Sequence, residues 1–284
     1  MNVIDTHIHS WNFSRARYTW LEGNTSLLNR DYEIAELEQA RTAAGVTGGV
    51  LVQAANNLED TDYMLDTAAA TPWLKGVVGW LPLTDPVLTE NLLRSTYAAN
   101  PYFKGVRHLI HDEADPRWLL QPAVIESLRI LAQYQLSYDL VGVQPEHIET
   151  AMAVAQQVPT LQMIFDHCNQ PPIAQAALYG RWGELMKAAA MLPQLHVKIS
   201  GLGVTAQKGD RWTAIDIMPY VSFLLEHFGV DRACCGGDWP VCLLAGSYEH
   251  AWRNYKEVLT SLLDAGALEK VFYTNAVAFY RLSV

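Results

Sequence analysis

Two short motifs near opposite ends of the chain carry residues that could do chemistry. Asp5-Thr6-His7-Ile8-His9 lies in a strand-like run, and Gly236-Gly237-Asp238-Trp239-Pro240 follows another. Side chains alternate between the two faces of a strand, so His7 and His9 project from one side, with Asp5 in the same row. Imidazoles and carboxylates that converge in this way suit a borderline cation such as Zn²⁺ and the activation of water. A histidine pair on an edge strand with no ligand is the alternative that the first motif alone leaves open.

The elements between the two motifs decide whether the motifs can meet. Short apolar or β-branched runs alternate with amphipathic stretches, which is typical of repeated βα units. Eight runs are predicted as strands: 2–9, 48–53, 76–81, 104–110, 136–141, 162–167, 195–200 and 233–238. Helices are predicted between them near 31–44, 61–70, 86–99, 122–135, 145–157, 175–192, 214–228 and 247–263. The sequence therefore predicts an α/β fold, a (β/α)8 TIM barrel forming a single domain over residues 1–284, with its first and last strands as neighbours.

Several predicted strands end in residues that could share one site. Barrel active sites lie at the C-terminal ends of the strands, where His9, His108, His111, His167 and Asp238 fall. A lone histidine at a strand end is more often a packing residue than a ligand, but several at one rim favour a site. We expect three imidazoles and one carboxylate to converge: those of His7, His9, His167 and Asp238.

Composition and charge exclude several classes of partner. Half of the 284 residues are hydrophobic, which is enough for a large core. The formal net charge of −10 disfavours nucleic acid and anionic membrane as partners, because phosphate binding relies on a basic surface. No signal segment and no apolar run long enough to cross a bilayer is evident, so a soluble, cytoplasmic protein with a small-molecule substrate is predicted. Whether the chain forms a homo-oligomer stays open.

The ordered set of motifs resembles a known family. Asp-x-His-x-His on the first strand, Asp166-His167 on the sixth and Gly-Asp-Trp-Pro on the eighth are similar to the amidohydrolase superfamily, specifically its amidohydrolase-2 branch of lactonases and related TIM-barrel hydrolases. Phe103-Lys104-Gly105-Val106-Arg107-His108 and Phe165-Asp166-His167-Cys168 resemble the sugar-lactone hydrolases of that branch. The resemblance implies a hydrolase of lactones of acids such as fuconate, rhamnonate or galactonate. It places His7, His9, His167 and Asp238 at the family's metal or catalytic positions.

The chain departs from the binuclear members of that family on the fifth strand. Those enzymes place a histidine there and use a carboxylated lysine or a glutamate as a bridge, whereas Leu136-Ser137-Tyr138-Asp139-Leu140-Val141 has no histidine. Lys104 lies at the wrong end of the fourth strand to act as a bridge, and a structural role is favoured for it. The prediction is therefore one divalent metal, with Zn²⁺ favoured, and a metal-independent site as the alternative.

Lactone hydrolysis assigns roles to the candidate residues. Attack of water on the ester carbonyl needs a base, a group that holds the oxyanion and a proton for the leaving alkoxide. We expect Asp238 to act as the base and to return its proton to the ring oxygen. Contacts to the substrate are expected from further residues: Arg107, His108, His111, and Trp11 and Trp239 as a flat apolar wall.

Two other readings of the same residues remain. A metal-dependent decarboxylase of the same superfamily would use a tightly bound metal, and a barrel without catalytic activity would bind a sugar acid without turning it over. Gly201-Leu202-Gly203-Val204-Thr205-Ala206 fits a loose dinucleotide-binding pattern, but it follows the seventh strand instead of opening a first βαβ unit, which disfavours a nicotinamide cofactor. Cys168, Cys234, Cys235 and Cys242 form no CxxC pair and are expected to be reduced.

Overall fold

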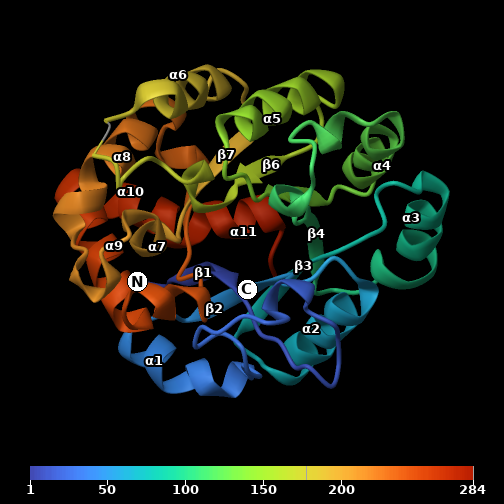
Figure 1. The fold of residues 1–284 in the computed structure, drawn as a ribbon, viewed down its shortest axis with the longest axis horizontal. Coiled ribbons are helices and arrows are strands. Elements are labelled where there is room, and N and C mark those ends of the chain that lie inside the picture. The colour runs from blue at the N-terminus through green and yellow to red at the C-terminus, as the bar shows by residue number, and fades with distance from the viewer. Residues whose placement is uncertain (177, 284) are drawn as a thin grey trace.

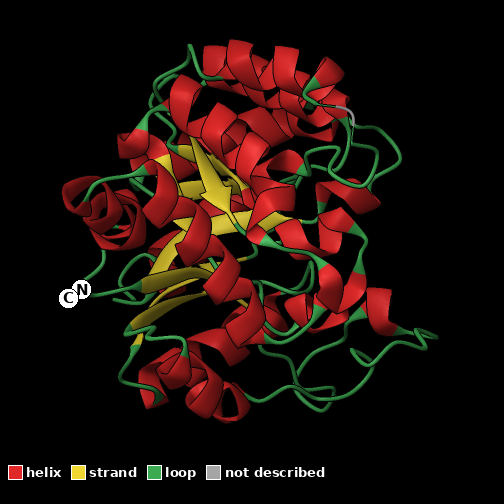
Figure 2. Ribbon diagram, turned by 90° about the vertical axis from the view of Figure 1, so that its left-hand side faces the viewer, coloured by secondary structure: helices red, strands yellow, loops and turns green. Residues whose placement is uncertain are grey.

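Eight parallel strands form the centre of the molecule, and helices surround them (Figures 1 and 2). The computed structural model describes residues 1–176 and 178–283. The strands pair in chain order and are β1 Ile4–Ile8, β2 Gly48–Val52, β3 Leu74–Gly79, β4 Phe103–His108, β5 Ser137–Leu140, β6 Met163–Phe165, β7 Leu195–Ile199 and β8 Ala233–Cys235. The α-helices are α1 Glu38–Ala43, α2 Leu58–Ala70, α3 Pro86–Leu92, α4 Pro122–Gln133, α5 Pro145–Gln157, α6 Gly180–Ala189, α7 Leu202–Ala206, α8 Ala214–Phe228, α9 Tyr248–Leu262, α10 Ala265–Glu269 and α11 Asn275–Tyr280. The predicted α/β barrel is confirmed, and each predicted strand overlaps one of these strands.

The barrel closes between β1 and the segment that follows β8. The backbone N–H of His9 donates to the carbonyl of Trp239 at 2.7 Å, and that of Asp238 donates to the carbonyl of His7 at 2.8 Å. The predicted eighth strand ends early, at Cys235, because two glycines follow it and Asp238 adopts φ +60°. These contacts bring the two terminal motifs together, as the sequence predicts.

Local signals explain where several of the helices begin. The side chains of Asn57, Asp85 and Ser247 accept hydrogen bonds from the first-turn amides of α2, α3 and α9, as N-cap residues do. Proline opens α3, α4 and α5, where its missing N–H costs no hydrogen bond. The predicted helix from residue 175 begins at Gly180, and its residue 177 lies outside the described residues.

Three α-helices were not predicted, α7, α10 and α11, and α11 fills the end of the barrel opposite the strands' C-terminal ends. Its Ala276, Phe279 and Tyr280 pack in one buried cluster with Ile4, Val50, Val52, Val78, Ile164, Cys234 and Leu282. Figure 1 shows α11 crossing the centre of the strand ring. The side chain of Asn275 anchors the helix by donating to the carbonyls of Val230 and Ala233. No helix among residues 1–176 and 178–283 is both long and apolar enough to cross a membrane.

Asp5 does not share a face with His7 and His9, which corrects the prediction for the first strand. The pairing of β1 with β2 shifts register between Asp5 and Ile8, and such an irregularity changes which face a side chain points to. The Asp5 carboxylate accepts from the N–H of Gly237 at 2.8 Å and from the hydroxyl of Tyr248 in α9 at 2.6 Å. Asp5 therefore ties the two motifs together from outside the cavity.

The crowding around Asp5 predicts a large effect of adding one methyl group. A Cβ on Gly237 would lie 2.6 Å from Oδ2 of Asp5 and 2.7 Å from Nε1 of Trp252. We expect Gly237→Ala to lower the free energy of unfolding by about 2–3 kcal/mol, measured by urea denaturation. Gly266→Ala in α10 is the control, because its nearest neighbour would be 3.6 Å away and alanine favours a helix. Equal stability of Gly237→Ala and the wild type would contradict this reading.

Candidate active site

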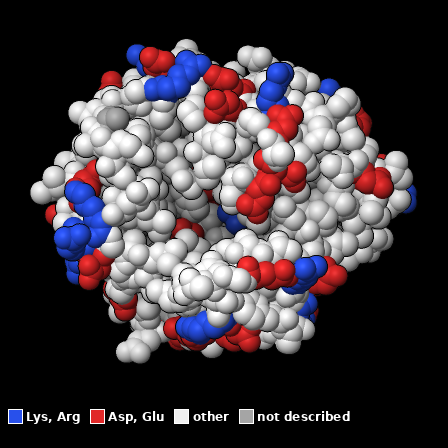
Figure 3. Space-filling model, viewed as in Figure 1, with Lys and Arg blue, Asp and Glu red and all other residues white. Residues whose placement is uncertain are grey.

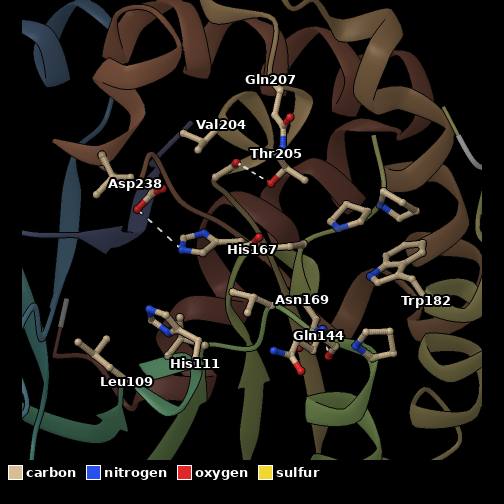
Figure 4. A pocket seen from close by; sticks show the side chains of 18 of the residues that line it. Leu109, His111, Gln144, His167, Asn169, Trp182, Val204, Thr205, Gln207 and Asp238 are labelled. Carbon is tan, nitrogen blue, oxygen red and sulfur yellow. Dashed lines mark hydrogen bonds and ion pairs between the residues drawn. The ribbon is translucent and has the colours of Figure 1, made fainter. Parts of the chain in front are cut away.

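A cavity of about 710 Å³ opens at the C-terminal ends of the strands. The space-filling view shows this face hollowed at its centre (Figure 3). Of the residues predicted to form the site, five line the cavity: His9, Arg107, His111, His167 and Asp238. Figure 4 shows Asp238 and His167 pointing toward each other, with Trp182 on the far side of the cavity. The location matches the position of active sites in α/β barrels.

Three imidazoles face one carboxylate at the floor of this cavity. Oδ1 of Asp238 lies 3.7 Å from Nε2 of His7, 3.6 Å from Nε2 of His9 and 3.9 Å from Nε2 of His167. The Nε2 atoms of His7 and His9 are 3.1 Å apart. The structure therefore brings these four side chains together, as predicted. His7 does not line the cavity, because it lies beneath the cavity surface and is fully buried.

Two of these residues sit in left-handed backbone conformations. His167 has φ +52° and begins a run of positive φ values that extends through Gln170, and Asp238 has φ +60°. Non-glycine residues rarely adopt this region, and each such residue costs of order 1 kcal/mol or more. Gly201 makes room for His167, since a Cβ on Gly201 would lie 2.5 Å from Nδ1 of His167. Strain of this kind is concentrated at functional sites, and here it turns both side chains into the cavity.

The ring orientations of two histidines are set by groups behind them. Nδ1 of His9 lies 2.7 Å from the carbonyl of Val52, which can only accept, so His9 donates from Nδ1 and keeps the lone pair of Nε2 toward Asp238. Nδ1 of His167 lies 2.9 Å from the hydroxyl of Ser200. Such partners fix which nitrogen of each ring faces the reacting atoms.

A buried ionic cluster beneath the histidines is the part of the site that the sequence analysis missed. Nζ of Lys198 in β7 lies 2.6 Å from Oδ2 of Asp139, 2.8 Å from Oδ1 of Asp166 and 3.2 Å from Nδ1 of His7. Lys198, Asp139 and Asp166 are all completely buried. Buried charges are rare unless they are paired, so a lysine inside an apolar strand was the available signal. The cluster supports His7 from below.

Burial governs the protonation of the groups at the cavity floor. It holds the pKa of His7 well below its ordinary value and lowers the pKa of His9 to about 3, with Arg107 acting in the same direction on His9. Burial also lowers the pKa of His167, and it raises the pKa of Asp238 although the positive charge of Arg107 lowers it. The histidines are therefore neutral at pH 7, as acceptors or metal ligands must be.

The charges of the buried cluster stabilise each other. Burial alone would raise the pKa of Asp166, but Lys198, His7 and Arg107 together hold it well below its ordinary range. Burial alone would lower the pKa of Lys198, but its two carboxylate partners raise it. The pKa of Asp139 rises to about 6 because its burial outweighs the attraction of Lys198.

Arg107 from β4 is held on several sides and still lines the cavity. Its guanidinium donates to Oδ2 of Asp166 at 2.9 Å, to the side-chain oxygen of Gln53 at 3.2 Å and to the carbonyl of Gln53. Nη1 also lies 3.3 Å from Nε2 of His7. These contacts engage up to four of the five N–H groups, which leaves one for an oxygen in the cavity. The arginine is rigidly placed to donate to a carbonyl or an oxyanion.

Three of the residues predicted to contact substrate do not line the cavity. His108 is buried between neighbours: Nδ1 accepts from the indole N–H of Trp80 at 3.0 Å, Nε2 contacts Glu113 at 2.7 Å, and the ring stacks on Trp118. Trp11 is completely buried and donates to the carbonyl of Arg30, and Trp239 packs against Tyr32. These are packing roles, which tryptophans and strand-end histidines commonly have.

Other aromatic residues form the apolar wall instead. Trp20 and Trp182 line the cavity, and their indole N–H groups are bound to the carbonyls of Ala54 and Cys168. His111 lines the cavity at the exposed rim, as predicted. The sequence signal for Trp20 was its place in the long segment after the first strand, and Trp182 had none because it lies on a helix.

The ligand-type atoms at the floor fit one divalent cation. Atoms of His7, His167 and Asp238 all lie within 4.8 Å of one another. Oδ1 of Asp238 is buried and has no hydrogen-bond partner among the described residues, so it presents a free acceptor toward the imidazoles. Two neutral imidazoles and a carboxylate are a donor set that suits Zn²⁺ and related ions.

The remaining sequence signals have structural explanations. Gly201 and Gly203 make room for His167 and for the ring of Trp212, where a Cβ on Gly203 would lie 2.5 Å from the indole nitrogen, so packing accounts for both glycines. All four cysteines are buried and unpaired, as expected. Burial raises the pKa of Cys234 to about 12, which makes it a poor nucleophile at neutral pH. Lys104 does not line the cavity.

Comparison with known proteins identifies relatives along nearly the whole chain. A family model described as amidohydrolase matches residues 4–282. An L-fucono-1,5-lactonase of Burkholderia ambifaria is 32% identical over 98% of this chain and 95% of its own. An L-rhamnono-gamma-lactonase of Scheffersomyces stipitis is 21% identical over 99% of this chain and 98% of its own. The crystal structure of an amidohydrolase from Burkholderia multivorans with bound zinc superposes with a TM-score of 0.89 at 28% identity, over the full length of both chains.

Proposed function

This chain belongs to the amidohydrolase family, and from that membership and the geometry of the cavity we propose that it hydrolyses the ester bond of a sugar-acid lactone. One observation carries the proposal: a buried carboxylate, one of whose oxygens has no hydrogen-bond partner in the described part of the chain, faces three neutral imidazoles and an arginine in an open cavity. The relatives named as L-fucono-1,5-lactonase support the substrate class, and L-fucono-1,5-lactone is the first candidate.

In the proposed reaction, Asp238 takes a proton from a water molecule as the water oxygen attacks the lactone carbonyl carbon. Its raised pKa makes the carboxylate a stronger base than an ordinary aspartate. Arg107 donates to the carbonyl oxygen as negative charge develops there, because it is buried and already oriented. When the tetrahedral intermediate collapses, the bond between the carbonyl carbon and the ring oxygen breaks, and Asp238 returns the proton to that oxygen. The product is the open-chain sugar acid.

The histidines orient the reacting groups. The Nε2 lone pair of His9 points toward Asp238. In the proposed reaction, Nε2 of His9 accepts a hydrogen bond from the attacking water. His167 follows the C-terminal end of β6 and borders the cavity beside Asp238. Trp20 and Trp182 offer flat apolar surfaces against which a sugar ring can lie.

We propose that one Zn²⁺ is the metal that fits this site, held by His7, His167 and Asp238. A bound divalent ion supplies a lower pKa for the attacking water or polarisation of the lactone carbonyl. We expect metal analysis to find at most one divalent ion per chain and His167→Ala to lower that content. Two or more ions per chain, or unchanged content in His167→Ala, would contradict the assignment. His250→Ala is the control, since His250 lies outside the cavity.

A panel of five- and six-membered aldonolactones tests the proposed function. A pH indicator reports acid release by the purified protein, with and without added Zn²⁺, after correction for spontaneous ring opening. We expect fast release for one stereochemical class of lactone. Silence across the panel with normal folding and metal content would favour the decarboxylase or the non-catalytic barrel. A cytoplasmic location and the absence of nucleic-acid partners are kept as predictions from the composition.

A further inference from the structure

A tyrosine of the last helix reaches the ionic cluster beneath the active site. The hydroxyl of Tyr280 in α11 donates to Oδ2 of Asp139 at 2.8 Å, and the aromatic ring is fully buried. The other oxygen of Asp139 is buried without a hydrogen-bond partner among residues 1–176 and 178–283. Tyr280 and Lys198 are therefore the two groups that hold this carboxylate, and both bind the same oxygen.

The contact continues from Asp139 to the cavity floor in two steps. Oδ2 of Asp139 holds Nζ of Lys198 at 2.6 Å, and Nζ of Lys198 contacts Nδ1 of His7 at 3.2 Å. Lys198 also lies 5.7 Å from the centre of the Tyr280 ring, so the tyrosine borders the ammonium directly. All four side chains are buried, where hydrogen bonds to charges are strong and displaced groups find no water to replace a lost partner.

We propose that Tyr280 is a positioning residue for the active site. Its hydroxyl holds Asp139 on Lys198, Lys198 in turn holds the Asp166 carboxylate and borders the ring of His7, and Asp166 contacts Nδ1 of His7 and so fixes that ring opposite Asp238. The effect on catalysis rests on the proposed lactonase function, whereas the effect on His7 does not. Tyr280 touches no atom of the cavity, so its role is carried entirely by the cluster. The C-terminal helix thereby belongs to the catalytic apparatus as well as to the barrel core.

Tyr280→Phe tests the proposal because it removes one hydroxyl and keeps the ring. Loss of a hydrogen bond to a charged group should lower kcat for the lactone by roughly tenfold while KM changes by less than about twofold. Tyr273→Phe is the matched control, since Tyr273 lies in the short helix before α11, packs against the same apolar cluster as Tyr280 and has no part in the contact with Asp139. Equal kcat values for Tyr280→Phe and the wild type, or equal losses in the two variants, would overturn the proposal.

A spectroscopic measurement separates this proposal from the function on which it rests. We expect the ¹⁵N imidazole signals of His7, assigned by their loss in His7→Asn, to shift in Tyr280→Phe and to stay in place in Tyr273→Phe. Unchanged His7 signals in folded Tyr280→Phe would overturn the positioning role, even if kcat fell. If the wild type opened no lactone, the proposed function would fail, and the His7 signals would still decide the positioning role. Should Tyr280→Phe not fold, Asp139→Asn weakens the same hold on Lys198, and the same shift is expected.

Discussion

Asp238→Asn is expected to lower kcat for lactone opening by roughly 10²–10⁴-fold, because an amide cannot take the proton of the attacking water. The substitution keeps the size of the side chain, and the backbone N–H of residue 238 still donates to the carbonyl of His7. Binding of the product acid, measured by calorimetry, should therefore change little. Steady-state rates on the best lactone of the panel give the kcat ratio.

The control for this prediction is Asp115→Asn, an exposed acidic residue outside the cavity. The rate of the wild type should also fall on the acidic side as Asp238 becomes protonated, since only the carboxylate acts as a base. Because burial raises the pKa of Asp238, this loss begins at a higher pH than for an ordinary aspartate. Near-normal kcat in Asp238→Asn would remove Asp238 from the role of base.

Lys198→Met is expected to lower the free energy of unfolding by about 3–5 kcal/mol, because it leaves two buried carboxylates without their shared cation. Within residues 1–176 and 178–283, Asp139 would keep only Tyr280, and Asp166 would keep Arg107 and His7. Urea denaturation at pH 8 measures the loss. Lys104→Met is the control: Lys104 is half-buried, forms no ion pair within the described residues, and should cost about 1 kcal/mol or less.

The deficit of Lys198→Met should shrink as the pH falls. Without the lysine, Asp139 has a folded-state pKa even further above its ordinary value than the value of about 6 in the wild type. A carboxyl group with a raised folded-state pKa contributes stability at low pH, and this contribution is lost as the pH rises through that pKa. The variant should therefore be closer to the wild type at pH 5 than at pH 8. A loss below about 1 kcal/mol at pH 8 would show that the ion cluster is not a major determinant of stability.

The barrel and its four converging side chains could be predicted because each is encoded locally. Alternating strand and helix patterns fix the order of the elements, and a closed barrel brings every C-terminal strand end to one rim. His167 and Asp238 were found because they lie two and three residues after the ends of β6 and β8. Their left-handed conformations could not be read from the sequence, since neither residue is a glycine.

The ionic cluster and the aromatic wall depend on contacts between distant elements. Strands buried on both faces carry nearly continuous apolar runs, so the pattern does not reveal which face of β5 or β7 points inward. Asp139 and Lys198 were therefore visible in the sequence but could not be paired. His108, Trp11 and Trp239 had suitable chemistry near the rim, and only packing against Trp118, Arg30 and Tyr32 removes them from the cavity. The register irregularity in β1 likewise turned Asp5 away from His7.

The most direct test of lactone hydrolysis by this protein is the rate of acid release from L-fucono-1,5-lactone by the metal-replete wild type, measured against spontaneous ring opening. We expect catalysed release that saturates with lactone concentration and yields fuconate as the product. Release at the spontaneous rate for this lactone and for every other aldonolactone of the panel, by a folded protein, would contradict it.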